Sequence, residues 1–234
     1  MNLLELKNIS KSFDNKKIID NVSFDIKPGK IVGLLGKNGS GKTTIIKMIN
    51  DLLTIDSGEI LIEGKTISEK TKSIISYLPE RTYFDNSQTI HEIFKFFQEF
   101  YPDFDITKAE QLLKDLDLDI NSRLSKMSKG MKEKIQLILV MSRRAKLYIL
   151  DEPLGGVDPS TRDYILHTIL SNFGEDSSLL ITTHLIADVE QILDEVIFID
   201  KGKIILNENT DNLREKENAS INEIFRRKVK WLKN

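Results

Sequence analysis

The chain has 234 residues and a formal net charge of −2, with 40% hydrophobic residues, 30% charged residues and no cysteine. A chain of this size and composition can bury its own hydrophobic core, and the lack of cysteine excludes a disulfide framework, a thiol nucleophile and a thiolate-bound metal site. The near-zero charge gives no overall field that would hold nucleic acid, so we expect no nucleic-acid partner.

The apolar stretches of the chain are short. Residues 31–35, 137–141 and 147–150 are the longest, and all fall far below the roughly 18–20 residues that span a bilayer. Residues 1–7 lack the basic and then apolar pattern of a secretion signal. We therefore expect a cytoplasmic chain that does not itself cross a membrane.

Strands and helices are expected to alternate in the first and last thirds of the chain. Alternating or continuous apolar patterns predict strands at residues 4–9, 18–26, 31–35, 147–150, 179–182 and 196–199. Helices are predicted at residues 42–53, from Pro159 and from Leu185. This order implies an α/β fold, with a parallel sheet covered by helices on both faces.

The middle of the chain is helical and acidic. Apolar residues repeat at helical spacing around residues 93–101, 112–118 and 129–144. Residues 82–120 contain nine acidic and three basic residues, a net charge of −6. We interpret residues 82–144 as a helical insertion into a core formed by residues 1–81 and 145–207, followed by a C-terminal helical tail at 208–234.

A glycine-rich segment lies between the predicted strand at 31–35 and the helix that follows it. It matches the phosphate-loop pattern G-x-x-x-x-G-K-[ST], in which glycines let backbone N–H groups point at phosphate oxygens. Lys42 is expected to neutralise the β- and γ-phosphates, and Thr43 to bind Mg²⁺. The residues expected to bind a nucleotide here are Gly36, Lys37, Asn38, Gly39, Ser40, Gly41, Lys42, Thr43 and Thr44.

Three further candidate residues follow apolar strands. Asp151 and Glu152 end the strand predicted at 147–150. Asp151 suits an Mg²⁺ site, and Glu152 suits a general base that polarises the attacking water. His184 follows the strand at 179–182, at the edge where such sheets bind ligands, and is expected to contact the γ-phosphate.

In this order, the motifs resemble those of the nucleotide-binding subunits of ABC transporters over residues 1–205. The most specific element is Met-Ser-Lys-Gly-Met at residues 127–131, which stands where the family has its Leu-Ser-Gly-Gly-Gln signature. The resemblance implies a P-loop NTPase (RecA-like) parallel sheet with an N-terminal antiparallel β subdomain, and ATP and Mg²⁺ as cofactors. It also implies two ATPase subunits, identical or paralogous, with Ser128 and Gly130 of one on the ATP held by the other.

Other positions match the family residue by residue. Phe13 stands where the family stacks an aromatic ring on adenine, although a place in the strand core is the alternative. Glu80 replaces the glutamine of the family's glutamine loop and is assigned to the metal ion. Asp158 fits the loop that reaches across the dimer. Lys129 and Met131 replace a Gly and the Gln of the signature, departures that leave the efficiency of the composite site open but not its existence.

The segment Tyr-Leu-Pro-Glu at residues 77–80, together with the altered signature, is similar to a bacterial subgroup of the family. That subgroup includes the ATPases of bacitracin-type resistance operons and of phenol-soluble modulin exporters. The resemblance therefore implies ATP-driven export, of peptides or antimicrobials, through a separate transmembrane subunit. It also implies a peripheral position on the cytoplasmic face of the membrane.

The aromatic residues of the middle segment allow two interpretations. A small helical subdomain needs large residues for its own core, which we favour for Phe97 and Phe100. Alternatively, aromatic residues line a groove for a basic amphipathic helix of the membrane subunit, and we assign Tyr83, Phe84 and residues 94–96 to that contact.

The basic tail at residues 220–234 also allows two interpretations. It either packs as a helix through Ile221, Ile224, Phe225 and Val229, which we favour, or lies on anionic lipid.

Two other functional classes remain open at this stage. A soluble ABC-type ATPase that acts in assembly, translation or DNA maintenance would carry the same motifs without a membrane partner. A small-molecule kinase or GTPase would need an acceptor site or an Asn-Lys-x-Asp guanine motif, and that motif is absent from the sequence.

Overall fold

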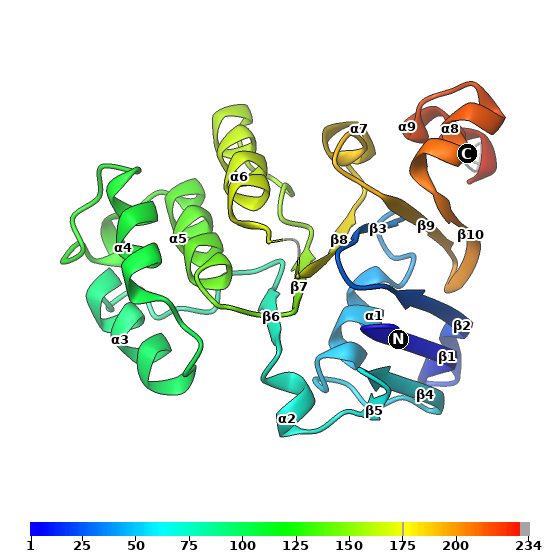
Figure 1. Cartoon of the computed structure of the whole chain (residues 1–234), viewed down its shortest axis with the longest axis horizontal. Coiled ribbons are helices and arrows are strands. Elements are labelled where there is room, and N and C mark those ends of the chain that lie inside the picture. The colour runs from blue at the N-terminus through cyan, green and yellow to red at the C-terminus, as the bar shows by residue number, and fades with distance from the viewer. Residues whose placement is uncertain (175, 230–234) are drawn as a thin grey trace.

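A computed structural model describes residues 1–174 and 176–229 of the chain and shows two sheets with helices packed around them (Figure 1). The larger sheet has the order β10-β9-β3-β8-β7-β6. Its strands are β3 (Ile31–Leu35), β6 (Ile75–Leu78), β7 (Leu147–Asp151), β8 (Ser178–Thr183), β9 (Glu195–Asp200) and β10 (Lys203–Asn209). All neighbours are parallel except β10, which is antiparallel to β9.

The smaller sheet is antiparallel and comes from the start of the chain. Its order is β2-β1-β4-β5. Its strands are β1 (Leu4–Phe13), β2 (Lys16–Ile26), β4 (Ser57–Ile62) and β5 (Lys65–Thr66). The two sheets confirm the predicted α/β class with an N-terminal antiparallel part.

Alternating side chains divide the parallel sheet into two buried faces, as successive residues of a strand point to opposite sides. On β3, Val32 and Leu34 pack with α1 (Lys42–Ile49) and the antiparallel sheet, whereas Ile31 and Leu35 pack with the later helices. Burial on both faces explains why this strand is apolar throughout.

Most of the remaining helices lie on the second face or at the ends of the parallel sheet, whereas α2 (Glu69–Lys72) lies on the side of the smaller sheet, near β5 (Figure 1). The others are α3 (Ile90–Phe100), α4 (Ile106–Lys114), α5 (Lys129–Met141), α6 (Pro159–Asn172), α7 (Ile186–Val189), α8 (Thr210–Glu217) and α9 (Ile221–Lys228), with a 3₁₀ turn at Leu124–Lys126. In Figure 1, α3, α4 and α5 lie together on the β6 side, and α8 and α9 lie at the opposite end.

The acidic middle segment has its own buried cluster, which includes Phe94, Phe97 and Phe104. Arg143 joins it to the core, because its guanidinium donates to Asp103 and to the carbonyls of Ser73 and Ile75. This segment thus has a buried cluster of its own, while Leu137, Val140 and Met141 of α5 pack in the core of the parallel sheet. We keep the boundaries predicted for this segment, the core and the tail as a proposal.

Several predicted helices end earlier than expected, among them the helix predicted at residues 129–144, which stops at Met141. The helix predicted at residues 42–53 stops at Ile49, because Asp51 has a φ of 59° and turns the chain, leaving Leu52 64% exposed. The helix predicted at residues 112–118 stops at Lys114, and Asp117 has a φ of 53°. Leu116 and Leu118 still pack against the helical cluster, so their spacing reflects burial rather than helix.

The tail packs on the sheet through the predicted apolar residues. Ile221, Ile224, Phe225 and Val229 are buried, and the rings of Phe225 and Phe198 make an edge-to-face contact. The packed alternative is confirmed for this part, whereas residues 230–234, which carry the end of the basic tail, lie outside the described residues.

Candidate active site

The phosphate loop connects β3 to α1, and its shape depends on glycine at two positions. A Cβ on Gly36 would lie 2.6 Å from the carbonyl oxygen of Ile199, and Gly41 has a φ of 111° immediately before α1. The N–H of Gly202 donates to the Ser40 carbonyl at 3.0 Å, so the β9–β10 hairpin supports the loop from below. The Ser40 side chain is buried beneath the loop, and its hydroxyl has no hydrogen-bond partner within residues 1–174 and 176–229.

Lys42 is held inside this loop. Its ammonium donates to the carbonyls of Gly36 at 2.7 Å and Lys37 at 3.1 Å, and it lies 3.0 Å from Glu152 Oε1. The side chain is only 4% exposed. A buried cation must stay paired with an anion, and a phosphate in place of the Glu152 carboxylate would keep Lys42 paired.

Asp151 lies at the end of β7, facing the start of α1. Its Oδ1 accepts hydrogen bonds from Thr182 at 2.6 Å and Thr43 at 3.3 Å. Burial raises the pKa of the Asp151 carboxyl, these two hydrogen bonds oppose that rise, and the carboxylates of Glu152 and Glu80 add to it. Its Oδ2 is buried and has no hydrogen-bond partner among the described residues, which leaves one oxygen available for a ligand.

Glu152 directly follows β7 and breaks the alternation of side-chain directions along the strand. Its φ of 51° is left-handed, and its N–H donates to the carbonyl and hydroxyl oxygens of Thr182, both at 3.0 Å. Neighbouring residues of a regular strand point to opposite faces. The left-handed residue instead lets Asp151 reach Thr43 while Glu152 reaches Lys42 on the same side. Such a conformation costs of order 1–3 kcal/mol and is typical of functional positions.

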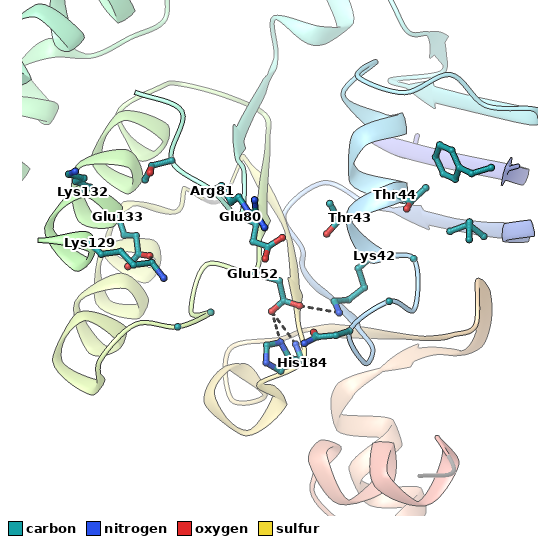
Figure 2. A pocket seen from close by; sticks show the side chains of 18 residues that line it. Lys42, Thr43, Thr44, Glu80, Arg81, Lys129, Lys132, Glu133, Glu152 and His184 are labelled. Carbon is teal, nitrogen blue, oxygen red and sulfur yellow. Dashed lines mark hydrogen bonds and ion pairs between the residues drawn. The ribbon is translucent and has the colours of Figure 1, made fainter. Parts of the chain in front are cut away.

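His184 follows β8 and contacts the same carboxylate. Its Nδ1 lies 2.9 Å from Glu152 Oε2, and its backbone N–H donates to that oxygen at 3.3 Å. Glu152 therefore links the phosphate-loop lysine to the histidine, as the dashed lines in Figure 2 show.

Lys42, Thr43, Glu152 and His184 face a cavity of about 1250 Å³, whereas Asp151, which is 1% exposed, is not among its lining residues. The cavity is lined by Phe13, Ile18, Asn38, Gly39, Gly41, Lys42, Thr43, Thr44, Glu80, Arg81, Thr82, Lys129, Lys132, Glu133, Glu152, Gly155, Gly156 and His184. Figure 2 shows Lys129, Lys132 and Glu133 on α5, across the cavity from Lys42. Phe13 is 44% exposed at this cavity, so the alternative of a strand core residue is wrong.

The comparisons with known proteins agree with this architecture. The sequence profile described as "ABC transporter" matches residues 19–155, which is more than half of the chain. The chain belongs to the ABC transporter family. It is an ATP-binding subunit of that family and an ATPase.

Similar curated proteins include the "ABC transporter ATP-binding protein YtrB" of Bacillus subtilis, at 33% identity over 91% of this chain and 74% of that protein. The "Lantibiotic transport ATP-binding protein SrtF" of Streptococcus pyogenes is 31% identical over 95% of this chain and 98% of that protein. Among solved structures, an "ATP binding subunit of ABC transporter" has a TM-score of 0.87 and 27% identity, covering 97% of this chain and 100% of that one.

Several residues that the sequence groups with this ABC site lie apart from the phosphate loop. Ser128 begins α5, where its hydroxyl accepts from the Met131 N–H at 3.2 Å. Asp158 begins α6, and hydrogen bonds from Ser160 and Thr161 hold its pKa well below the usual range. A Cβ on Gly130 would lie 3.5 Å from Asp158 Oδ2, so these three residues form one surface, which we call the signature surface.

The signature surface does not contribute to the cavity wall, which receives the neighbouring Lys129 and Gly156 instead. Within the phosphate loop, Gly36, Lys37 and Ser40 are also not among the lining residues. Gly36 and Lys37 supply carbonyl oxygens to Lys42 rather than a surface to the cavity.

Sequence reasoning missed several polar residues at the site. Thr182 orients both acids through one hydroxyl, and its position in Thr-Thr-His before His184 was the available signal. Arg81 and Glu133 line the cavity without belonging to any motif, and Lys132, which also lines it, follows directly after the signature segment. Burial raises the pKa of Glu133, while Lys129, 3.6 Å away, opposes the rise.

Proposed function

We propose that this chain hydrolyses Mg²⁺–ATP with Lys42, Thr43, Asp151, Glu152 and His184 and thereby drives transport through a separate membrane subunit. The convergence of Lys42 and His184 on one carboxylate, Glu152, is the observation that carries the proposal. This arrangement places Glu152, the proposed base, beside Lys42, which would hold the terminal phosphate.

The residues present fit Mg²⁺. Asp151 has a buried oxygen without a partner, and Thr43 offers a hydroxyl beside it, which are hard oxygen ligands of the kind Mg²⁺ takes together with substrate phosphates. Glu80 lines the same cavity and is our third ligand candidate. When bound, the ion would neutralise charge on the β- and γ-phosphates. Among the residues described, no cluster of three or more His, Cys, Asp or Glu offers a different metal site.

The proposed reaction begins from the arrangement that the structure shows. ATP takes the place of Glu152 at the Lys42 ammonium, with the loop N–H groups of Gly39 and Gly41 around the phosphates and Phe13 on the adenine. Glu152, released from Lys42, then accepts a proton from the attacking water. His184 holds the γ-phosphate.

We infer that a second ATPase subunit completes the site. The signature surface of Ser128, Gly130 and Asp158 lies outside the cavity of its own chain, so it is available to the nucleotide of another copy or a paralogue. The N-terminus of α5 at Ser128 provides backbone N–H groups and a positive helix end, which suit a phosphate.

A membrane subunit is the proposed partner of the helical segment, whose charge and exposed rings both suit a basic amphipathic helix. The structure corrects our choice of residues. Phe94, assigned to the contact, is fully buried, and Phe100, assigned to the core, is 68% exposed, because Phe100 lies on the outer face of α3. Phe97 is buried as expected.

The proposed docking surface therefore consists of Tyr83, Phe84, Phe96 and Phe100, which we call the aromatic patch. Tyr83 is 55% and Phe96 48% exposed, and the rings of Phe96 and Phe100 stack at 4.7 Å. Phe84 is half-buried against Phe97. The double variant F96S/F100S should lose stimulation of ATP turnover by the membrane subunit, whereas L170S, an equally exposed apolar residue on α6, should retain it. Equal stimulation in both variants would refute this contact.

Export of peptides or antimicrobials is our proposed transport role. Its support is the similarity to a protein named for lantibiotic transport and to a Bacillus subtilis protein named for linearmycin resistance, which is 32% identical over 87% of this chain and 68% of that protein. Across residues 1–174 and 176–229, no helix is long and apolar enough to cross a membrane. We propose a peripheral position on the cytoplasmic side of the membrane, held by the partner subunit.

The function can be tested by purifying the chain together with the membrane protein encoded beside it. ATP turnover should require Mg²⁺, disappear with EDTA and rise in the assembled complex. A chain that hydrolyses ATP but captures no membrane protein would favour an ATPase without a transport role.

A further inference from the structure

The end of the β1–β2 ribbon carries Phe13 beyond the edge of its sheet. The last pair between β1 and β4 is Ser10 with Ser57, whereas β1 and β2 remain paired as far as Phe13 and Lys16. Asp14 and Asn15 then form a two-residue turn with φ values of 46° and 62°. An isolated two-stranded ribbon is only marginally stable, so its tip needs another contact to hold a fixed position.

Asp56, the residue immediately before β4, provides that contact. One carboxylate oxygen accepts from the Ser12 N–H at 2.7 Å, and the other accepts from the Lys11 ammonium at 2.7 Å. Its own N–H donates to the Ser10 carbonyl at 3.0 Å. The Asp56 side chain thus continues the hydrogen bonding along the edge of β1 where the β4 backbone no longer reaches.

Lys11 connects this carboxylate to the aromatic ring. The residue is only 8% exposed, and its ammonium lies 5.6 Å from the centroid of the Phe13 ring, within the range of a cation–π interaction. A cation near the ring also draws the π electrons of the ring toward itself. This lowers the repulsion between the ring and an aromatic base stacked on it. The pairing with Asp56 allows a buried ammonium to stay at this place.

We propose that Asp56 and Lys11 form a clamp that positions the Phe13 ring for stacking on the nucleobase, so that Asp56 tunes ATP affinity without touching the nucleotide. The proposal rests on the proposed stacking role of Phe13. Asp56 and Lys11 are positioning residues, and their effect should be confined to ligands that contain a base.

The test compares ATP with inorganic tripolyphosphate, which has the phosphates but no base. In D56N, the Kd and the KM for ATP should rise roughly three- to tenfold at unchanged kcat, and the Kd for tripolyphosphate should not change. K11M, which keeps the apolar stem, should have a similar effect. The matched control is D51N, which lies in the same loop and weakens the Asp51–Lys72 ion pair (2.9 Å). Asp51 has no contact with β1 in the described structure, so the D51N variant should bind both ligands normally.

A double-mutant cycle separates the clamp from the stacking role on which it rests. F13A should weaken ATP binding by itself, and D56N should then add nothing in the F13A background. If F13A leaves ATP affinity unchanged, the stacking role fails. If F13A weakens ATP binding while D56N and K11M do not, the clamp is refuted. The clamp is also refuted if D56N weakens the binding of ATP and of tripolyphosphate to the same extent. The D56N/K11M double variant removes both charges, so an unpaired buried ammonium cannot account for its effect.

Discussion

The phosphate-loop edge of the sheet and the signature surface carry residues that the sequence assigns to one ATP site, yet they differ in how complete they are. At the sheet edge, Lys42 and His184 both contact the carboxylate of Glu152. At the signature surface, Ser128 and Asp158 use their side chains to begin their own helices. At the sheet edge, the fold of one chain thus brings two side chains to the carboxylate of a third. At the signature surface, the side chains serve to begin two helices.

The sheet edge and the signature surface differ because different parts of the fold build them. The ends of parallel strands meet at one edge, so residues distant in sequence are brought together by the fold itself. The signature surface is built from the starts of α5 and α6, and its residues Ser128, Gly130 and Asp158 are not among those that line the cavity of their own chain. We expect substitutions in the first region to affect a single chain and those in the second to affect only the assembled pair.

The largest expected effect is that of K42A. It removes the ammonium that would bind two phosphates and leaves Glu152 without its cation, so ATP affinity should fall roughly 10²–10⁴-fold in a single chain. Equilibrium binding of ATP measures it. The control K47A, at an exposed position in the last turn of α1, should bind ATP normally. Normal ATP binding by K42A would contradict the assignment of Lys42 to the phosphates.

E152Q should separate binding from hydrolysis. The amide cannot accept the proton of the attacking water, so turnover should fall by ~10²–10⁴, the usual size of a general-base effect. ATP binding should be unchanged or tighter, because the carboxylate that competes for Lys42 is gone. Steady-state turnover and ATP binding are measured together, with E63Q as a control remote from the cavity. Turnover near that of the parent chain would overturn the role of Glu152.

S128A tests the other region. ATP binding by one chain should be unaffected, whereas turnover of the pair should fall roughly 10²-fold, as expected for loss of a hydrogen-bond donor in a preorganised site. Mixing S128A chains with K42A chains should restore part of the turnover, because each mixed pair has one site with both an intact Lys42 and an intact Ser128. An absence of recovery would mean that Ser128 acts within its own chain.

T182V should have the smallest effect. It keeps the shape of the side chain but removes the hydroxyl that donates to Asp151 at 2.6 Å and accepts from the Glu152 N–H. Supporting contacts around a metal ligand are typically worth ten- to a hundredfold, so turnover should fall roughly tenfold, with a higher Mg²⁺ requirement. T183V removes the adjacent hydroxyl, which accepts from the Leu185 N–H, and should leave the Mg²⁺ requirement unchanged.

Short, strongly patterned elements were predictable from the sequence. The apolar runs that became β3, β7 and β8 are buried on both faces, and the glycine-rich loop stands between β3 and α1 as expected. Helix ends and single surface positions were less predictable. Left-handed residues such as Asp51 end a helix without changing its apolar pattern, and exposure within an aromatic run depends on what packs beside it.

The sequence by itself determined the chemistry of this protein, because the phosphate loop, the paired acids and the histidine are local motifs whose residues sit next to the strands that present them. Tertiary structure alone decided how these residues are arranged. The left-handed backbone of Glu152 turns two consecutive acids to one side, Thr182 orients both, and Asp56 reaches back to β1 across 44 residues of sequence. Such contacts join segments distant along the chain, so no periodicity or spacing in the sequence records them.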